Sequence, residues 1–284
     1  GYCHSDDSFN IASVCLHRGE EPAISGPDGI CNIFFTNCNL RCIYCQNHQI
    51  SDYRISRAIT SRKLNEVIGQ IIPMLEKGVT HVGFVSPSHF IPQMKLLIRT
   101  ISRMGFDPVW VYNTNAYDRV ETLRSLEGVI DVYLPDLKYM EGDLSAALSG
   151  APDYPEVASA ALREIFRQKG STLHLDDRDT ALSGLIVRHL VLPGYVGNSL
   201  KVIRFLSGEL SPKIHLSLMS QYYPVQRVSG HPAMHRTITA EEYQEVIDEM
   251  ESSGMYRGWV QDFESSDFYR PDFENDHPFE PHYK

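Results

Sequence analysis

Six short segments of β-branched and aromatic residues alternate with amphipathic segments between residues 32 and 251. Strict alternation of this kind implies strand-then-helix units, which build a parallel sheet with right-handed crossovers. Six units in order fit either a partial barrel or an open doubly wound sheet. The predicted strands are 32–36, 81–85, 109–112, 130–134, 185–192 and 213–219. The predicted helices are 64–75, 92–104, 118–126, 155–169, 198–207 and 239–251.

Local signals support several of these boundaries. Gly78 and Gly105 follow apolar stripes at helical spacing, as C-terminal caps do. Pro92 stands at the start of a helix, where its missing N–H costs nothing. Thr239 with Glu242 forms a capping box that opens the last helix.

The chain divides into three parts. Residues 1–30, rich in Gly, Pro and Asp, are expected to be an irregular N-terminal extension, and residues 31–260 to be the (β/α)6 core. Residues 261–284 form an acidic, aromatic C-terminal tail, which can pack on the core through its Phe and Tyr rings.

Composition narrows the functional class. The net charge of −10 argues against binding to nucleic acid, because phosphate neutralisation needs a basic face. The chain has no apolar run of about 18 residues and no cleavable signal sequence, so we expect no membrane association and a cytoplasmic protein.

The cysteines are the strongest chemical signal. Cys38, Cys42 and Cys45 lie within eight residues, with the spacing Cys-x3-Cys-x2-Cys, directly after the first predicted strand. Thiolates this close favour zinc or an iron–sulfur cluster. Structural zinc normally takes four ligands, and three thiolates would leave one iron of a four-iron cluster open. His48 could complete a zinc site, so both metals remain possible from spacing.

The motif and the chain order together resemble the radical S-adenosylmethionine (SAM) superfamily. The aromatic Tyr44 before the last cysteine belongs to the same pattern. More narrowly, the segments 19–27, 32–36 and 38–42 resemble an uncharacterised branch related to pyruvate formate-lyase activating enzyme. The resemblance extends from about residue 2 to residue 260, and it implies a partial (β/α)6 TIM-type barrel.

The resemblance also implies a chemistry. Cys38, Cys42 and Cys45 would bind a [4Fe–4S] cluster, SAM would chelate its fourth iron, and Tyr44 would lie near the adenine. Reductive cleavage of SAM would yield a 5′-deoxyadenosyl radical that takes hydrogen from an unactivated carbon. An electron donor such as flavodoxin or ferredoxin is implied as a partner, and a glycyl-radical enzyme or another protein as the substrate.

Further candidates lie just after the predicted strands, where barrel enzymes place their sites. They are Ser86, Ser88, Asn113, Asp136 and Lys138, together with Arg188, which lies on the fifth predicted strand. Asp136 and Lys138 match an Asp-Leu-Lys motif of the activating enzymes. In those enzymes the Asp helps to bind a monovalent cation, and the Lys faces the SAM carboxylate. The activating enzymes also have a Gly-Gly-Glu motif whose backbone holds the amino group of SAM. This motif is absent here, and Ser86 and Ser88 occupy its place. Arg188 resembles a cofactor contact, although it could equally form a structural ion pair with a barrel acid.

Two other functions remain open. The same cofactor chemistry could act on a small molecule or modify a peptide. Alternatively, the chain could be a non-enzymatic electron carrier or zinc-stabilised binding module, although electron carriers normally close their clusters with four cysteines.

The remaining cysteines, Cys3, Cys15 and Cys31, are expected to be reduced thiols. Cys3 also resembles the end of a cysteine-rich N-terminal segment found in longer relatives.

Overall fold

The computed structural model describes residues 3–56, 61–263, 265, 270–275 and 277–279. Within these residues the sheet has the strand order β1-β2-β3-β4-β5-β7-β8-β9, and β6 pairs with β7 as a side branch. The strands are β1 Ile11–His17, β2 Ile30–Phe35, β3 His81–Val85, β4 Val109–Thr114, β5 Val132–Pro135, β6 His174–Leu175, β7 Ala181–Leu190, β8 His215–Met219 and β9 Gly258–Val260.

The strands from β2 to β9 along this path run parallel, in the order in which they occur in the chain. The described sheet is not closed, because β1 and β9 stand at its two ends. The predicted partial barrel is therefore confirmed, and the six predicted strands correspond to β2, β3, β4, β5, β7 and β8.

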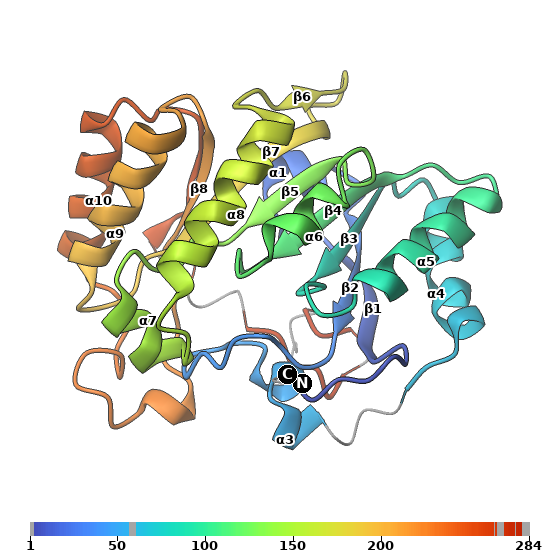
Figure 1. Cartoon of the computed structure of the whole chain (residues 1–284), viewed down its shortest axis with the longest axis horizontal. Helices are drawn as coiled ribbons and strands as arrows, with labels where there is room; N and C mark the ends of the chain where they lie inside the picture. Colours follow the sequence, from blue (N-terminus) through green and yellow to red (C-terminus); the bar gives the residue numbers. More distant parts are fainter. Residues whose placement is uncertain (1–2, 57–60, 264, 266–269, 276, 280–284) are drawn as a thin grey trace.

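Helices cover the outer face of the sheet (Figure 1). Helices α4 and α5 lie together at one end, α9 and α10 lie together at the other, and α6 and α8 lie between them. The helices are α1 Pro22–Ser25, α2 His48–Ser51, α3 Tyr53–Ser56, α4 Leu64–Glu76, α5 Ile91–Arg103, α6 Val120–Arg124, α7 Gly142–Ser149, α8 Tyr154–Lys169, α9 Val196–Phe205 and α10 Ala240–Ser252. A π-helical turn, Leu206–Leu210, extends α9, and a 3-10 turn spans Gln226–Val228.

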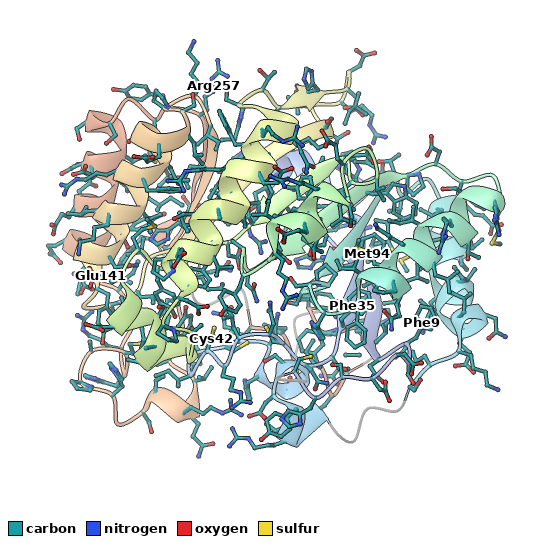
Figure 2. The ribbon with its side chains drawn as sticks, viewed as in Figure 1. Phe9, Phe35, Cys42, Met94, Glu141 and Arg257 are labelled. Carbon is teal, nitrogen blue, oxygen red and sulfur yellow. The ribbon has the colours of Figure 1, made fainter. Side chains whose placement is uncertain are left out.

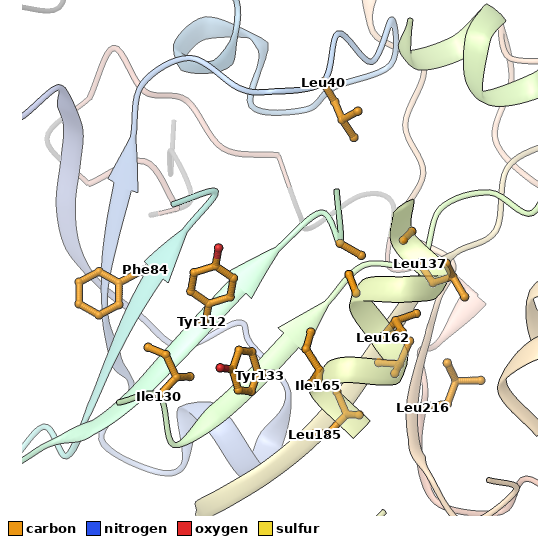
Figure 3. Packing of buried hydrophobic residues seen from close by; sticks show 14 of the residues in the cluster. Leu40, Phe84, Tyr112, Ile130, Tyr133, Leu137, Leu162, Ile165, Leu185 and Leu216 are labelled. Atoms are coloured by element: carbon orange, nitrogen blue, oxygen red, sulfur yellow. The ribbon is translucent and has the colours of Figure 1, made fainter. Parts of the chain in front are cut away.

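The core lies between the sheet and these helices. Figure 3 shows rings from β3, β4 and β5, among them Phe84, Tyr112 and Tyr133, on the side of the sheet that packs against Leu162 and Ile165 of α8. Met94 of α5 and Phe35 of β2 belong to the same buried cluster (Figure 2). Burial of these apolar faces holds the helices on the sheet.

Side chains alternate across each strand, so the opposite face of the sheet points into the barrel. Its lower part is apolar and is filled by Ala23 and Ile24 of α1, which pack with Val111, Val132 and Ile186. Asn113 of β4 and Arg188 of β7 lie two residues after Val111 and Ile186. Because side chains alternate along a strand, they also point into the barrel. Helix α1 thus closes the barrel at the amino ends of the strands and leaves a polar space above it.

The N-terminal extension is more regular than the sequence indicated. Strand β1 pairs antiparallel with β2, with Cys15 opposite Asn32 and His17 opposite Ile30. The pairing brings the next residues, from Arg18 to Glu21, beneath the barrel opening, just before α1. This part of the chain therefore contributes to the barrel interior.

The predicted helix boundaries also agree closely with the structure. The Thr239 hydroxyl accepts a hydrogen bond from the Glu242 amide (3.2 Å), and the Glu242 carboxylate accepts one from the Thr239 amide (2.8 Å). Pro92 lies in the first turn of α5. In the C-terminal tail, Phe273 and Phe279 pack on Phe34 of β2, with ring centroids 5.1 and 5.5 Å apart. Glu264, Asp267, Phe268, Tyr269, Asp276 and Glu280 of that tail lie outside the described residues.

Within the described residues, no helix is long and apolar enough to cross a membrane.

Candidate functional site

The three motif cysteines lie in the loop that follows β2, at the carboxyl ends of the parallel strands. Backbone bonds attach this loop to the end of α7: the amides of Arg41 and Ile43 donate to the carbonyls of Ser149 and Leu148 at 3.0 and 2.9 Å. These carbonyls belong to the last turn of a helix and have no partner within it. Figure 2 shows Cys42 beside α7.

Each cysteine sulfur has a polar neighbour. Cys42 Sγ accepts a hydrogen bond from the Ser149 hydroxyl at 3.0 Å, and Cys45 Sγ lies 3.2 Å from the Ser51 hydroxyl. Cys38 Sγ accepts from the Asn115 side-chain amide at 3.4 Å. Donors of this kind stabilise thiolates and tune a metal bound to them.

All three cysteines line one cavity of about 230 Å³. Cys3 lines it as well, and all six cysteines of the chain are free thiols. Burial raises the pKa of Cys42 to about 11, although the nearby Lys138 ammonium opposes this rise. Burial and the other two thiolates raise the pKa of Cys38 to about 12. Binding of a metal would therefore have to displace protons from these thiols.

The donor set fits an iron–sulfur cluster. Three soft sulfur ligands face one cavity, and an ammonium lies close enough to lower the pKa of two of them. Within the described residues no three His, Cys, Asp or Glu side chains converge as the ligands of one metal ion would. A cluster makes a different demand, since each thiolate binds its own iron.

A second, smaller cavity of about 190 Å³ adjoins the cysteines on the barrel side. Its walls contain Cys42, Tyr44, Cys45, Asp136 and Lys138, together with Arg188. Tyr44 is buried, and its hydroxyl lies 2.6 Å from that of Tyr139, which in turn lies 2.7 Å from the Ser149 hydroxyl. A hydrogen-bonded chain therefore connects the Tyr44 ring to the sulfur of Cys42.

Arg188 and Asp136 form the centre of a charged network inside the barrel. Arg188 Nε donates to Asp136 Oδ1 at 2.7 Å, and Lys138 Nζ donates to Asp136 Oδ2 at 2.9 Å. The alignment comes from the sheet, because Asp136 and Arg188 are parallel bridge partners. Burial raises the pKa of Asp136, but the two cations outweigh burial and hold that pKa below its usual range.

The other two nitrogens of the Arg188 guanidinium also donate hydrogen bonds. Its Nη1 donates to Glu20 Oε2 at 3.1 Å and its Nη2 to Asn113 Oδ1 at 2.7 Å. Glu20 Oε1 in turn accepts from the Asn32 side chain at 2.9 Å. Burial lowers the pKa of Arg188, but the surrounding carboxylates raise it well above its usual value, so the guanidinium stays charged.

The two serines predicted to contact the cofactor lie in different surroundings. Ser86 lines the barrel cavity, has a left-handed backbone (φ 54°) and donates its amide to the Asn113 carbonyl at 2.9 Å. Ser88 lines neither the cysteine cavity nor the barrel cavity, and its hydroxyl lies 3.3 Å from the Thr114 hydroxyl. The structure thus places Ser88 outside these cavities. It gathers the other predicted cofactor contacts with the cysteines or the barrel cavity, namely Tyr44, Ser86, Asn113, Asp136, Lys138 and Arg188.

Sequence reasoning missed two acids, Glu20 and Glu21, and the polar link Asn32. The inward position of Asn32 could have been predicted, since Asn32 lies two residues after Ile30 on the same strand and therefore on the same, inward face. Glu20 and Glu21 lie in segment 19–27, which contributes to the family resemblance, but no role was predicted for them because the segment was expected to be irregular.

Comparison with known proteins agrees with this geometry. A model of the 4Fe–4S single cluster domain family matches residues 24–147. An uncharacterised protein of Methanocaldococcus jannaschii, MJ0674, is 27% identical over 252 residues, which cover 87% of this chain and 68% of MJ0674.

Two solved structures are similar over most of the chain. SuiB of Streptococcus suis, bound to its precursor peptide SuiA, superimposes with a TM-score of 0.53 at 14% identity and covers 80% of this chain. The enzyme anSMEcpe, with bound AdoMet and the Kp18Cys peptide, gives a TM-score of 0.54 at 12% identity and covers 84%. This chain spans 47% of SuiB and 62% of anSMEcpe.

Fold and site therefore define the class: an open parallel α/β barrel with a 4Fe–4S single cluster match at its cysteine loop. More narrowly, the chain has the fold of radical SAM enzymes such as SuiB and anSMEcpe, as its sequence predicted.

Proposed function

We propose that this chain is a radical SAM enzyme that abstracts hydrogen from a carbon atom of a peptide or protein substrate. The observation that carries the proposal is the position of Cys38, Cys42 and Cys45, which lie at the carboxyl end of a barrel next to the Lys138–Asp136–Arg188 network. When bound, the cluster and SAM would supply one-electron cleavage of the sulfonium and hence hydrogen-atom abstraction.

The residues of the chain have separate tasks in this proposal. The three cysteines would hold the cluster, and Lys138 would pair with the SAM carboxylate, since its ammonium lies in the cavity wall beside Cys42 and Cys45. Tyr44 lines the same cavity and would form the adenine wall. Asn113 and Ser86 line the barrel cavity beyond, where they would contact the other end of SAM or the substrate.

The barrel wall would keep water away from the reacting carbon. The cavity is closed below by α1 and flanked by Phe34, Trp259 and Phe279. Exclusion of water and oxygen is a requirement for radical chemistry.

The finer prediction, activation of a glycyl-radical enzyme, is one form of this proposal. Two of the similar structures contain a bound peptide, SuiA or Kp18Cys, which favours a peptide or protein substrate over a small molecule. A monovalent cation beside Asp136, an electron donor such as flavodoxin or ferredoxin, and a cytoplasmic location remain predictions from the sequence.

The decisive experiment is anaerobic iron and sulfide analysis with electron paramagnetic resonance, before and after addition of SAM. We expect about four irons per chain, a spectrum that SAM perturbs, and release of 5′-deoxyadenosine with a reductant. Cys42→Ala should lose the iron, whereas Cys15→Ala, which changes a buried cysteine outside the loop, should retain it. Stoichiometric zinc, or a spectrum that does not change when SAM is added, would falsify the proposal.

A further inference from the structure

The barrel holds a cavity of about 250 Å³ beyond the cysteines. It adjoins the smaller cavity beside Cys42 and Cys45, since the two share wall residues. The shared residues are Gln46, Asn47, Asp136, Arg188, Met219 and Gln221. A substrate in this cavity would therefore lie directly beside the cofactor position proposed above.

Carboxyl groups outnumber cations around this cavity. The described wall contains the carboxylates of Glu20, Glu21 and Asp136 and the guanidinium of Arg188, and the Lys138 ammonium adjoins it. His17 also lines the wall, but burial lowers its pKa, so it adds no positive charge at neutral pH. Three carboxyl groups thus face two cations, so one carboxyl group has no cation of its own.

The structure also shows which of the three carboxyl groups lacks a cationic partner. Both oxygens of Asp136 and both oxygens of Glu20 accept hydrogen bonds from Arg188, Lys138 or Asn32. Glu21 makes no ion pair among the described residues, and its Oε2 atom is buried without any hydrogen-bond partner. The residue is only 8% exposed. Burial raises the pKa of Glu21 more than the nearby Arg188 guanidinium lowers it, and Oε2 still has no hydrogen-bond partner. A buried carboxyl oxygen of this kind on a cavity wall is available to a group from outside the chain.

The other residues of the cavity wall indicate the shape of the molecule that could bind there. Phe34, Val85 and Trp259 are apolar, and the opening towards the cysteines carries the amides of Gln46 and Gln221. A cavity of this volume accepts one extended side chain with a charged tip, whereas a folded segment is too large for it. Long cationic side chains have this form, with an apolar stem and a charged head.

We infer that the substrate carries an ammonium or guanidinium group on an extended apolar stem, and that this group binds in the barrel cavity against Glu21. The inference rests on the proposed function and specifies the substrate class for that site. Lysine and arginine side chains of a peptide have this chemistry, as do free alkylamines. Burial raises the pKa of Glu21, and a bound cation would reverse that effect.

The test is calorimetric titration of anaerobically reconstituted protein in the presence of SAM and without reductant, so that no turnover occurs. The probes are n-pentylamine and n-butylguanidine, with 1-pentanol and pentanoate as neutral and anionic counterparts. The capped tripeptide Gly-Lys-Gly, compared with Gly-Gln-Gly, distinguishes a peptide side chain from a free amine.

We expect the cationic probes alone to bind saturably, and Glu21→Gln to weaken that binding by about tenfold or more, as the loss of one charge-assisted hydrogen bond implies. Glu245→Gln, which removes an exposed acid of α10, is the matched control and should leave binding unchanged. If the protein binds Gly-Lys-Gly but does not bind n-pentylamine, the cationic group belongs to a peptide side chain and not to a free amine.

Equal binding of 1-pentanol and n-pentylamine, or no effect of Glu21→Gln, would overturn the inference. So would complete displacement of the amines by a low concentration of K⁺, because a metal ion would then satisfy Glu21. These results are separate from the proposed function: protein that binds iron and SAM but no amine loses only this inference, whereas protein that binds no iron loses the function as well.

Discussion

At the scale of single residues, Arg188 has the largest structural role in the site. All three of its donor nitrogens are used, by Asp136, Glu20 and Asn113. Its side chain is only 13% exposed, so these bonds lie in surroundings that screen charge poorly. From sequence, Arg188 could have been a cofactor contact or a structural ion pair. The ion pair is present, and contact with SAM remains a prediction.

We expect Arg188→Met to lower the free energy of unfolding by about 3 kcal/mol, because Glu20 and Asp136 would remain buried without their shared cation. Arg178→Met is the control, since it removes only an exposed pair with Asp28 and should cost less than about 1 kcal/mol. Urea unfolding of both variants checks this. Similar small losses in the two variants would contradict the structural role of Arg188.

At the scale of elements, strand parity and cross-strand contact arrange the site. Gly83 of β3 lies beside Asn32 of β2, its parallel partner. A Cβ atom at Gly83 would come within 2.1 Å of the Asn32 side-chain oxygen. The absence of a side chain at position 83 therefore lets Asn32 reach across the barrel and bond Glu20.

Gly83→Ala is expected to destabilise the protein by about 1–3 kcal/mol, because the added methyl must displace the Asn32 amide from Glu20. Gly69→Ala provides the comparison, since Gly69 lies in α4 with no atom within 4 Å of a built Cβ. Alanine there should stabilise the helix by up to about 1 kcal/mol. Thermal unfolding of both variants measures the difference, and a neutral Gly83→Ala would show that Asn32 can turn elsewhere without loss.

At the scale of the whole molecule, segments from the two ends of the chain complete the barrel. Glu20 and Glu21 close it at the amino ends of the strands, and the tail places Phe279 on its wall. The Phe279 ring lies 4.1 Å from the ring of His17 at the end of β1, and Gln49 Nε2 donates to Asp272 Oδ1 at 2.9 Å. The enclosure of the cavity thus depends on contacts more than 200 residues apart in sequence.

Phe279→Ala should open the cavity to solvent and cost about 1 kcal/mol of stability, since the ring is half-buried. The measurement is acrylamide quenching of tryptophan fluorescence, because Trp259 lines the cavity while Trp110, the other tryptophan, is buried. Quenching should rise in Phe279→Ala and stay unchanged in Phe263→Ala, which removes an exposed ring. Equal quenching in all three proteins would mean that the tail does not seal the barrel.

The local pattern of the chain was enough to predict the strand–helix order, the helix caps and the three cysteines, because periodicity, capping and ligand spacing are properties of neighbouring residues. It was also enough to place Asn113, Asp136 and Lys138 at strand ends. The position of the unpartnered Glu21 oxygen in the barrel wall depended on the tertiary structure. Glu20 is 168 residues from Arg188, and the antiparallel pairing of β1 with β2 brings them together. Pairing over such a distance depends on loop closure and burial across the whole barrel, which no local sequence pattern encodes.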